Sequence, residues 1–200
     1  YRNIYFVTNN GKLPKCIKPQ KNYISILYSD LLGSRAYNSC TIETSLHKIK
    51  GLSEYYLYFN DDFILVDYLK LSDFISKSGK LIWYEESNLL IKFVNKFPII
   101  TKIYDWGDSG TSVSRNNLYN KLNIKNTNPI SHAPRIFKKS MVKNLCKVFS
   151  NEIKDQQQRL VRSDKDFPFV DAFCFYYYKK NKLIFSNKYK TKIWVQFDSL

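Results

Sequence analysis

The sequence has no long apolar run, only two histidines and no closely spaced pair of cysteines. No apolar stretch in the 200-residue sequence approaches the length of roughly 18 residues that a membrane-spanning helix needs. No secretory signal peptide is visible. The four cysteines are widely separated and no C-x-x-C pair occurs among them: Cys16, Cys40, Cys146 and Cys174. We therefore expect free thiols, with neither a zinc motif nor a disulfide framework.

Acidic residues are scarce relative to basic ones. The chain holds 32 Lys and Arg against 17 Asp and Glu, which gives a net charge of +15, and only residues 51–100 carry more acidic than basic side chains. A basic body around an acidic segment suits a metal-dependent enzyme with anionic substrates, although a lysine-rich surface can also reflect composition alone. Because the basic residues are scattered and no known nucleic-acid-binding motif is present, we expect no nucleic-acid partner.

Apolar patterning predicts alternating strands and helices in a single domain over residues 1–200. We expect strands at 3–7, 23–28, 55–59, 80–85 and 192–197, a helix at 41–49, and loops at 105–114 and 123–131. The strand–helix–strand order between 23 and 59 favours parallel pairing. The predicted fold class is therefore α/β, with a Rossmann-like, mainly parallel sheet and flanking helices.

Two further helices are predicted in the second half of the chain. The first has an apolar stripe at helical spacing, formed by Phe137, Met141, Leu145 and Val148. The second carries Phe169, Phe173 and Tyr177 and would be capped by Ser163 or Asp164.

Two adjacent carboxylates follow a strongly apolar segment. Residues 55–59 are all aromatic or apolar, which predicts a buried strand, and Asn60, Asp61 and Asp62 come directly after it. Open α/β sheets bind ligands at the carboxyl ends of their strands. Oxygen ligands of this kind suit Mg²⁺ or Mn²⁺, which usually hold substrate phosphates. Taken alone, the same residues could simply start a turn or cap a helix.

Several separated stretches resemble one known family. They are Ile4–Asn10, Tyr37–Ser39, Ile42-Glu43, Leu46–Ile49, Gly51–Glu54, Leu57–Phe63, Ser131–Arg135, Lys139-Ser140 and Arg162–Asp166. In this order they resemble the second and third conserved regions of the Stealth family. That family comprises phosphotransferases that build phosphodiester-linked bacterial capsular polysaccharides, together with the animal lysosomal-enzyme N-acetylglucosamine-1-phosphotransferase. Ile193–Asp198 resembles the short fourth region. The first region, a strand ending in a Trp-Val-Asp type motif, has no counterpart, and we expect the upstream part of the domain to be missing from this sequence.

The resemblance implies a sugar-1-phosphate transferase. The donor would be a UDP-sugar, the acceptor a hydroxyl of a growing capsular polysaccharide, and the product a phosphodiester. The family's setting implies the bacterial cytoplasm, with peripheral association at the inner face of the inner membrane. Two alternatives remain: a metal-dependent glycosyltransferase that uses a nucleotide-sugar, or a non-catalytic basic binding protein or inactive fragment.

The same resemblance assigns roles to particular side chains. His132 would be the general base, because its ordinary pKa near 6.5 allows it to accept a hydroxyl proton. Mg²⁺ or Mn²⁺ would be held by Asp61 or Asp62 together with Asp198, and Asp62 is also expected to act in catalysis. If His132 and Asp62 serve one substrate phosphate, they must lie within roughly 15 Å of each other. The alternative is that His132 is an ordinary loop residue.

Arg162 is expected to bind the transferred phosphoryl group through its planar guanidinium. Asp166 would orient Arg162 across one helical turn, although the two could equally form an exposed ion pair of little consequence. Glu43, Asn60 and Arg135 are expected to contact substrate. For Glu43 and Arg135, a solvated position on a helix is the alternative.

Overall fold

Three pairs of strands form the β-structure in a computed structural model that describes residues 2–33, 38–63, 67–85, 115, 117–124, 130–163 and 165–186. The pairs are β1 (Ile4–Thr8) with β2 (Tyr23–Leu27), β3 (Tyr55–Tyr58) with β5 (Arg135–Lys138), and β4 (Leu81–Tyr84) with β6 (Leu183–Ser186). The first and third pairs are parallel and the second is antiparallel. The predicted loop at 105–114 and strand at 192–197 lie outside the described residues.

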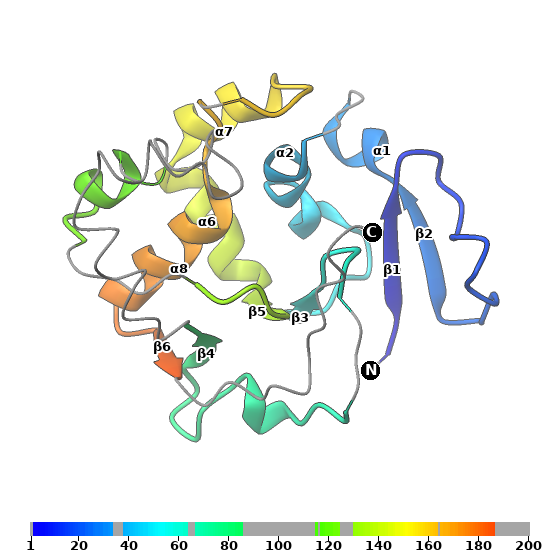
Figure 1. Cartoon of the computed structure of the whole chain (residues 1–200), viewed down its shortest axis with the longest axis horizontal. Helices are drawn as coiled ribbons and strands as arrows, with labels where there is room; N and C mark the ends of the chain where they lie inside the picture. Colours follow the sequence, from blue (N-terminus) through cyan, green and yellow to red (C-terminus); the bar gives the residue numbers. More distant parts are fainter. Residues whose placement is uncertain are drawn as a thin grey trace, which may run out of the picture.

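The helices gather mainly on one side of the strands. Short α1 (Tyr28–Leu32) follows β2, while α2 (Ser39–Glu43) and the 3₁₀ helix η1 (Leu46–Lys48) precede β3. A second 3₁₀ helix, η2 (Leu71–Asp73), precedes β4. Figure 1 shows α6 (Lys139–Val148), α7 (Ser150–Gln157) and α8 (Phe169–Lys179) on the side of β3 and β5 away from β1 and β2. None of the described helices is long and apolar enough to cross a bilayer.

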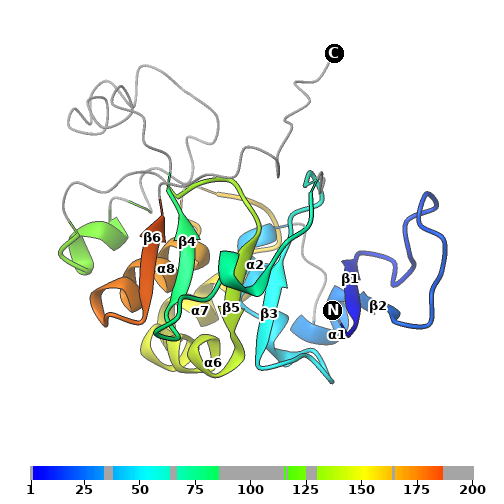
Figure 2. The ribbon, with the colours of Figure 1, turned by 90° about the horizontal axis from the view of Figure 1, so that it is seen from below.

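Four strands lie side by side in the order β6, β4, β5, β3, as Figures 1 and 2 both show. Between β4 and β5 there is no hydrogen-bonded ladder among the described residues, but Trp83 Nε1 donates a hydrogen bond to the carbonyl of Ile136 at 2.9 Å. An isolated antiparallel bridge joins Glu85 to Ile130. The described strands are therefore mixed in direction, and a single Rossmann-like sheet is not confirmed.

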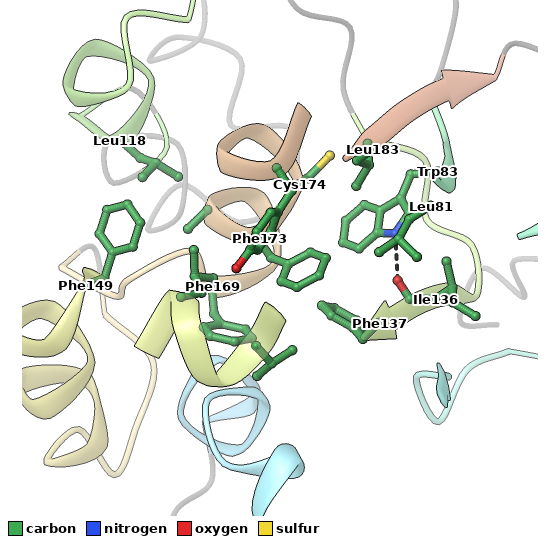
Figure 3. Packing of buried hydrophobic residues seen from close by; sticks show 14 of the residues in the cluster. Leu81, Trp83, Leu118, Ile136, Phe137, Phe149, Phe169, Phe173, Cys174 and Leu183 are labelled. Carbon is green, nitrogen blue, oxygen red and sulfur yellow. Dashed lines mark hydrogen bonds between the residues drawn. The ribbon is translucent and has the colours of Figure 1, made fainter. Parts of the chain in front are cut away.

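The core packs α8 against β4 and β5. Phe173 stacks on Trp83 with ring centroids 5.6 Å apart, and both rings contact Phe137 (Figure 3). All three side chains are at most 3% exposed. Aromatic pairs in these geometries stabilise a fold beyond the area they bury, by about 0.5–1.5 kcal/mol each. This cluster joins β4 to β5 where backbone pairing is lacking.

The strand predictions at 3–7, 23–28, 55–59 and 80–85 are confirmed to within one or two residues, and the α/β class holds. The parallel pairing expected for the strand at 55–59 is wrong, because β3 pairs antiparallel with β5. That strand is also not buried on both faces: Tyr55 and Leu57 are 39% and 37% exposed, whereas the alternate Tyr56 and Tyr58 pack inward on Phe137.

Each of the predicted helices is shorter than expected. The helix at 41–49 divides into α2 and η1, since the buried Thr44 hydroxyl bonds to the Thr41 carbonyl at 2.7 Å and so competes with the helical backbone. Phe137 belongs to β5 rather than to the following helix, and Val148 at the end of α6 is 48% exposed. The helix expected to be capped at 163 or 164 begins at Phe169, after Pro168.

Candidate active site

Asp62 and His132 lie in direct contact, although 70 residues separate them. Asp62 Oδ2 is 2.8 Å from His132 Nε2, and both side chains are about half exposed. Tyr58 is opposite Arg135 in the β3–β5 register, so the segment after β3 and the segment before β5 meet at one end of the pair. The Phe63 ring meets the His132 ring edge-on at 4.8 Å. The expected proximity of Asp62 and His132 is confirmed.

Glu43 lies beside the same end of the strand pair. The hydroxyl of Tyr58 donates a hydrogen bond to Glu43 Oε1 at 3.0 Å. Burial raises the pKa of Glu43 to about 7, against the opposing influence of the Arg135 guanidinium and of the Tyr58 hydrogen bond. Burial and the neighbouring Glu43 raise the pKa of the Tyr58 phenol well above its ordinary value. Glu43 can therefore exchange a proton near neutral pH, at the end of the β3–β5 pair where Tyr58 and Arg135 lie.

Three buried polar atoms in this region have no hydrogen-bond partner within the described part of the chain: Asn60 Oδ1, Ser131 Oγ and Arg135 Nε. Arg135 Nη2 meanwhile donates to the Ser131 carbonyl at 3.2 Å. Because buried polar groups are nearly always satisfied, donors and acceptors in this position are available to a bound ligand. They flank Asp62 and His132 in the sequence, on the segments that leave β3 and enter β5.

Arg162 and Asp166 occupy a neighbouring part of the molecule, at the start of α2. Arg162 Nη2 donates to Ser39 Oγ at 3.0 Å. Asp166 is 1% exposed, and its carboxylate accepts hydrogen bonds from Asn38 Nδ2 at 2.8 Å and Ser163 N at 3.1 Å. The residues around Arg162 and Asp166 are not helical, so the expected orientation of one by the other across a helical turn is wrong.

A buried polar network connects the segment of Arg162 to α2. Gln156 Nε2 donates to Thr41 Oγ1 at 2.9 Å and to Asp166 Oδ1 at 3.3 Å. Thr41 Oγ1 in turn donates to the carbonyl of Arg159 at 3.0 Å. Gln156, Thr41 and Asn38 are all fully buried. A satisfied network of this kind specifies one arrangement, and it fixes the backbone on either side of Arg162 relative to α2, which also carries Glu43.

One buried carboxylate was missed by the sequence analysis. Asp171, in the first turn of α8, is 7% exposed and pairs with Arg115 Nε at 3.3 Å and with the Tyr119 hydroxyl at 3.2 Å. The charge of Asp171 raises the pKa of Arg115 and also acts to raise the pKa of Glu43. An aspartate inside an otherwise apolar helix is the signal that could have identified it, since buried carboxylates are rare unless paired.

The described residues do not form a complete protein cage for a metal ion. No group of three or more His, Cys, Asp or Glu side chains that could hold a metal occurs among them, and Asp198 lies outside them. Asp61 and Asp62 are both exposed at the end of β3. Magnesium is commonly bound through one or two carboxylates together with substrate phosphates and water. The chemistry of this donor set therefore fits a divalent cation that arrives with a phosphate-bearing substrate.

Comparisons with known proteins identify a family model and several relatives that match this chain. Residues 1–82 match the family model described as Stealth protein CR2, conserved region 2. A capsular polysaccharide phosphotransferase of Haemophilus influenzae is 27% identical over 186 residues, covering 88% of this chain and 48% of its own length.

Two further relatives carry related names. An exopolysaccharide phosphotransferase of Mycobacterium tuberculosis is 29% identical over 150 residues, which cover 75% of this chain and 27% of that protein. A capsular polysaccharide phosphotransferase of Actinobacillus pleuropneumoniae is 32% identical over 145 residues, which cover 70% of this chain and 38% of that protein. The chain thus spans half or less of the length of these curated relatives. The family match and the relatives together place the chain in the Stealth family.

Proposed function

We propose that the chain transfers a hexose or N-acetylhexosamine 1-phosphate from a UDP-sugar to a hydroxyl of a growing capsular polysaccharide. The contact between Asp62 and His132 carries this proposal, since it pairs a carboxylate with a histidine at an open strand end. The names of the relatives support the reaction class. The proposed setting is the bacterial cytoplasm, with peripheral association at the inner face of the inner membrane.

In this reaction the acceptor oxygen attacks the phosphorus that bears the sugar. A new O–P bond forms, the anhydride bond to the second phosphorus breaks, and UMP leaves. His132 accepts the proton that the acceptor hydroxyl loses. When Nε2–H donates to Asp62, Nδ1 is the nitrogen that takes this proton, and the carboxylate then stabilises the imidazolium. Asp62 therefore sets the orientation and the tautomer of His132.

Positive charge and polar donors would hold the diphosphate. Arg162 presents a planar set of N–H donors beside α2, and Arg135 has a buried Nε without a partner among the described residues. Transfer of a phosphoryl group depends mainly on positioning and on charge stabilisation. We propose Glu43 and Asn60 as further substrate contacts. Glu43 accepts a hydrogen bond from the Tyr58 hydroxyl, and Asn60 lies two residues before Asp62 in the chain.

We also propose that Mg²⁺ or Mn²⁺ binds at Asp61 and Asp62, with Asp198 as a third ligand. The ion would neutralise charge on the diphosphate. Binding of Mn²⁺ can be followed by electron paramagnetic resonance in the presence of UDP, without turnover. Asp61→Asn and Asp62→Asn should each weaken the signal of bound Mn²⁺, while Asp67→Asn, on an exposed segment further along, should not. Equal binding in all three variants would contradict this site.

The linkage in the product tests the reaction. Purified protein is incubated with a UDP-N-acetylhexosamine and an oligosaccharide acceptor, and the product is examined by ³¹P NMR. A phosphodiester resonance in the product, with release of UMP, is the expected result. A phosphate-free glycoside with release of UDP would instead identify a glycosyltransferase. His132→Ala and Asp62→Ala should lower turnover by about 10²-fold or more. Unchanged turnover would show that these two side chains are not catalytic, whereas no turnover by the wild-type protein would favour a non-catalytic binding protein.

A further inference from the structure

A second concave site lies at the other end of the β3–β5 pair. It is a pocket of about 350 Å³, and its walls include Tyr55, Lys138, Asn144, Tyr177, Lys180 and Lys182. Tyr55 and Lys138 are opposite each other at the start of β3 and the end of β5. The remaining four come from α6, from the end of α8 and from the turn before β6. A volume of this size is within the range of ordinary ligand sites.

The pocket is basic and partly aromatic. Its three lysines come from two parts of the chain, Lys138 at the end of β5 and both Lys180 and Lys182 between α8 and β6, and no carboxylate belongs to its lining. Ser140, which lies at the start of α6 and also lines the pocket, donates hydrogen bonds from its backbone and hydroxyl groups to Glu54. Three lysines that line one cavity create a positive potential that attracts an anion more strongly than an isolated surface lysine does. The pocket therefore favours an anionic ligand.

Two tyrosines, Tyr55 and Tyr177, add aromatic and polar surface to the lining of the pocket. The Tyr55 ring is 39% exposed and Lys138 Nζ lies 5.2 Å above its centroid, so the ring stays accessible beside a cation. At the floor, the Tyr177 hydroxyl accepts from Asn144 Nδ2 at 3.1 Å and donates to the Met141 carbonyl at 2.6 Å. An exposed ring offers a flat apolar surface to the C–H groups of a sugar, while hydroxyl and amide groups meet its polar edges.

The position of the pocket separates it from the Asp62–His132 site. From Tyr55 to Tyr58 the strand rises about 10 Å, and Asp62 lies further along the chain beyond that end. Tyr55 and Leu57 form the exposed side of β3 between the two sites. A ligand that engages both ends must therefore be extended along β3.

We propose that the pocket binds a phosphodiester-bearing segment of the polysaccharide, behind the end that reacts at His132. This inference rests on the proposed function for the identity of the polymer, and on the pocket itself for its chemistry. The lysines contact the phosphodiester groups and Tyr55 packs on a sugar ring. Holding the polymer here raises the local concentration of its reactive end at His132, so long acceptors are used in preference to short ones.

Binding of defined oligomers to the purified protein tests the pocket directly. The probe is an oligosaccharide of N-acetylhexosamine units joined by phosphodiesters, and calorimetry is performed without a nucleotide-sugar. The double variant Lys180→Ala/Lys182→Ala should bind at least about tenfold more weakly, because charged hydrogen bonds are lost. The matched control is Lys147→Ala/Lys154→Ala, which removes the same charge from exposed positions on α6 and α7. Tyr55→Ala should also weaken binding, whereas Tyr68→Ala, at a 90% exposed tyrosine, should not.

Four results would overturn the proposal. They are no binding of the oligomer, equal loss in the control double variant, equal binding of inorganic polyphosphate with no effect of Tyr55→Ala, and lysine-dependent binding of anionic phospholipid vesicles in place of the oligomer. Because the calorimetry contains no nucleotide-sugar, the measured binding of the oligomer does not depend on whether the chain catalyses transfer. In a transfer assay, the lysine double variant should raise KM for a long acceptor and leave KM for a monosaccharide acceptor unchanged.

Discussion

Replacing Glu43 by glutamine should make the protein more stable at pH 8 and leave its stability unchanged at pH 4.5. Burial raises the pKa of Glu43 from 4.5 to about 7 in the folded chain. A carboxyl group whose pKa is raised by folding contributes full stability below its unfolded pKa. That contribution decreases as the pH rises from 4.5 to about 7, because the unfolded chain ionises first.

The magnitude follows from the size of the shift. Each pKa unit corresponds to about 1.4 kcal/mol, so ionisation of Glu43 lowers the free energy of unfolding by about 3 kcal/mol at pH 8. Glutamine has no charge, and its side-chain oxygen can still accept the hydrogen bond from Tyr58. For a chain of this size, about 3 kcal/mol corresponds to a rise of about 6–12 °C in Tm at pH 8.

The assay is thermal unfolding of the wild-type protein and Glu43→Gln at pH 4.5, 6 and 8, at one ionic strength. Only the difference between the two proteins is used, so other titrating groups cancel. Asp155→Gln, at an exposed position on α7, is the control and should change Tm little at every pH. A difference in Tm that is constant with pH, or a variant less stable than wild type at pH 8, would refute the argument that ionisation of Glu43 lowers the free energy of unfolding.

Three other substitutions distinguish roles within the site. Arg162→Lys should lower turnover of the UDP-sugar by about 10²-fold while Tm stays constant, because lysine keeps the charge but loses the planar contact; full activity would mean that Arg162 does not bind the phosphoryl group. Asp166→Asn should lower the free energy of unfolding by about 2–3 kcal/mol in denaturant titrations, since an amide N–H would face the donors of Asn38 or Gln156; an unchanged midpoint would contradict this network. Asp62→Asn should lower kcat, because an amide cannot stabilise the imidazolium that forms when His132 accepts the proton, and an unchanged kcat would show that Asp62 does not assist His132.

Local sequence determined four of the six described strands, whereas β5 and β6 were not predicted. The runs at 4–8, 23–27, 55–58 and 81–84 are rich in β-branched and aromatic residues, and each forms a strand in the structure. Phe137, in contrast, fits the apolar spacing of the helix that follows, and local pattern therefore places it in that helix although it lies in β5. Residues 135–138 form a strand since β3 offers them a partner, and strand pairing depends on residues about 80 positions away in the sequence.

The residue types of the site were also readable from the sequence. Carboxylates after an apolar strand, together with a histidine in a separate family motif, identified Asp62 and His132 as candidates. Their contact at 2.8 Å was decided by the antiparallel pairing of β3 with β5, which brings the end of one strand to the start of the other. No local pattern contains that information, because the sequence does not state which strands pair.

Burial separates what the sequence determined from what only the tertiary structure decided. Asp166 and Arg162 have the spacing of a surface ion pair, yet Asp166 is enclosed by Asn38 and Gln156 from two other segments. Likewise, Glu43 is an ordinary helical glutamate by its neighbours in sequence, and the packing around Tyr58 raises its pKa to about 7. The chain carries the ionisable groups, but their charge state depends on desolvation, which arises only when distant segments pack together.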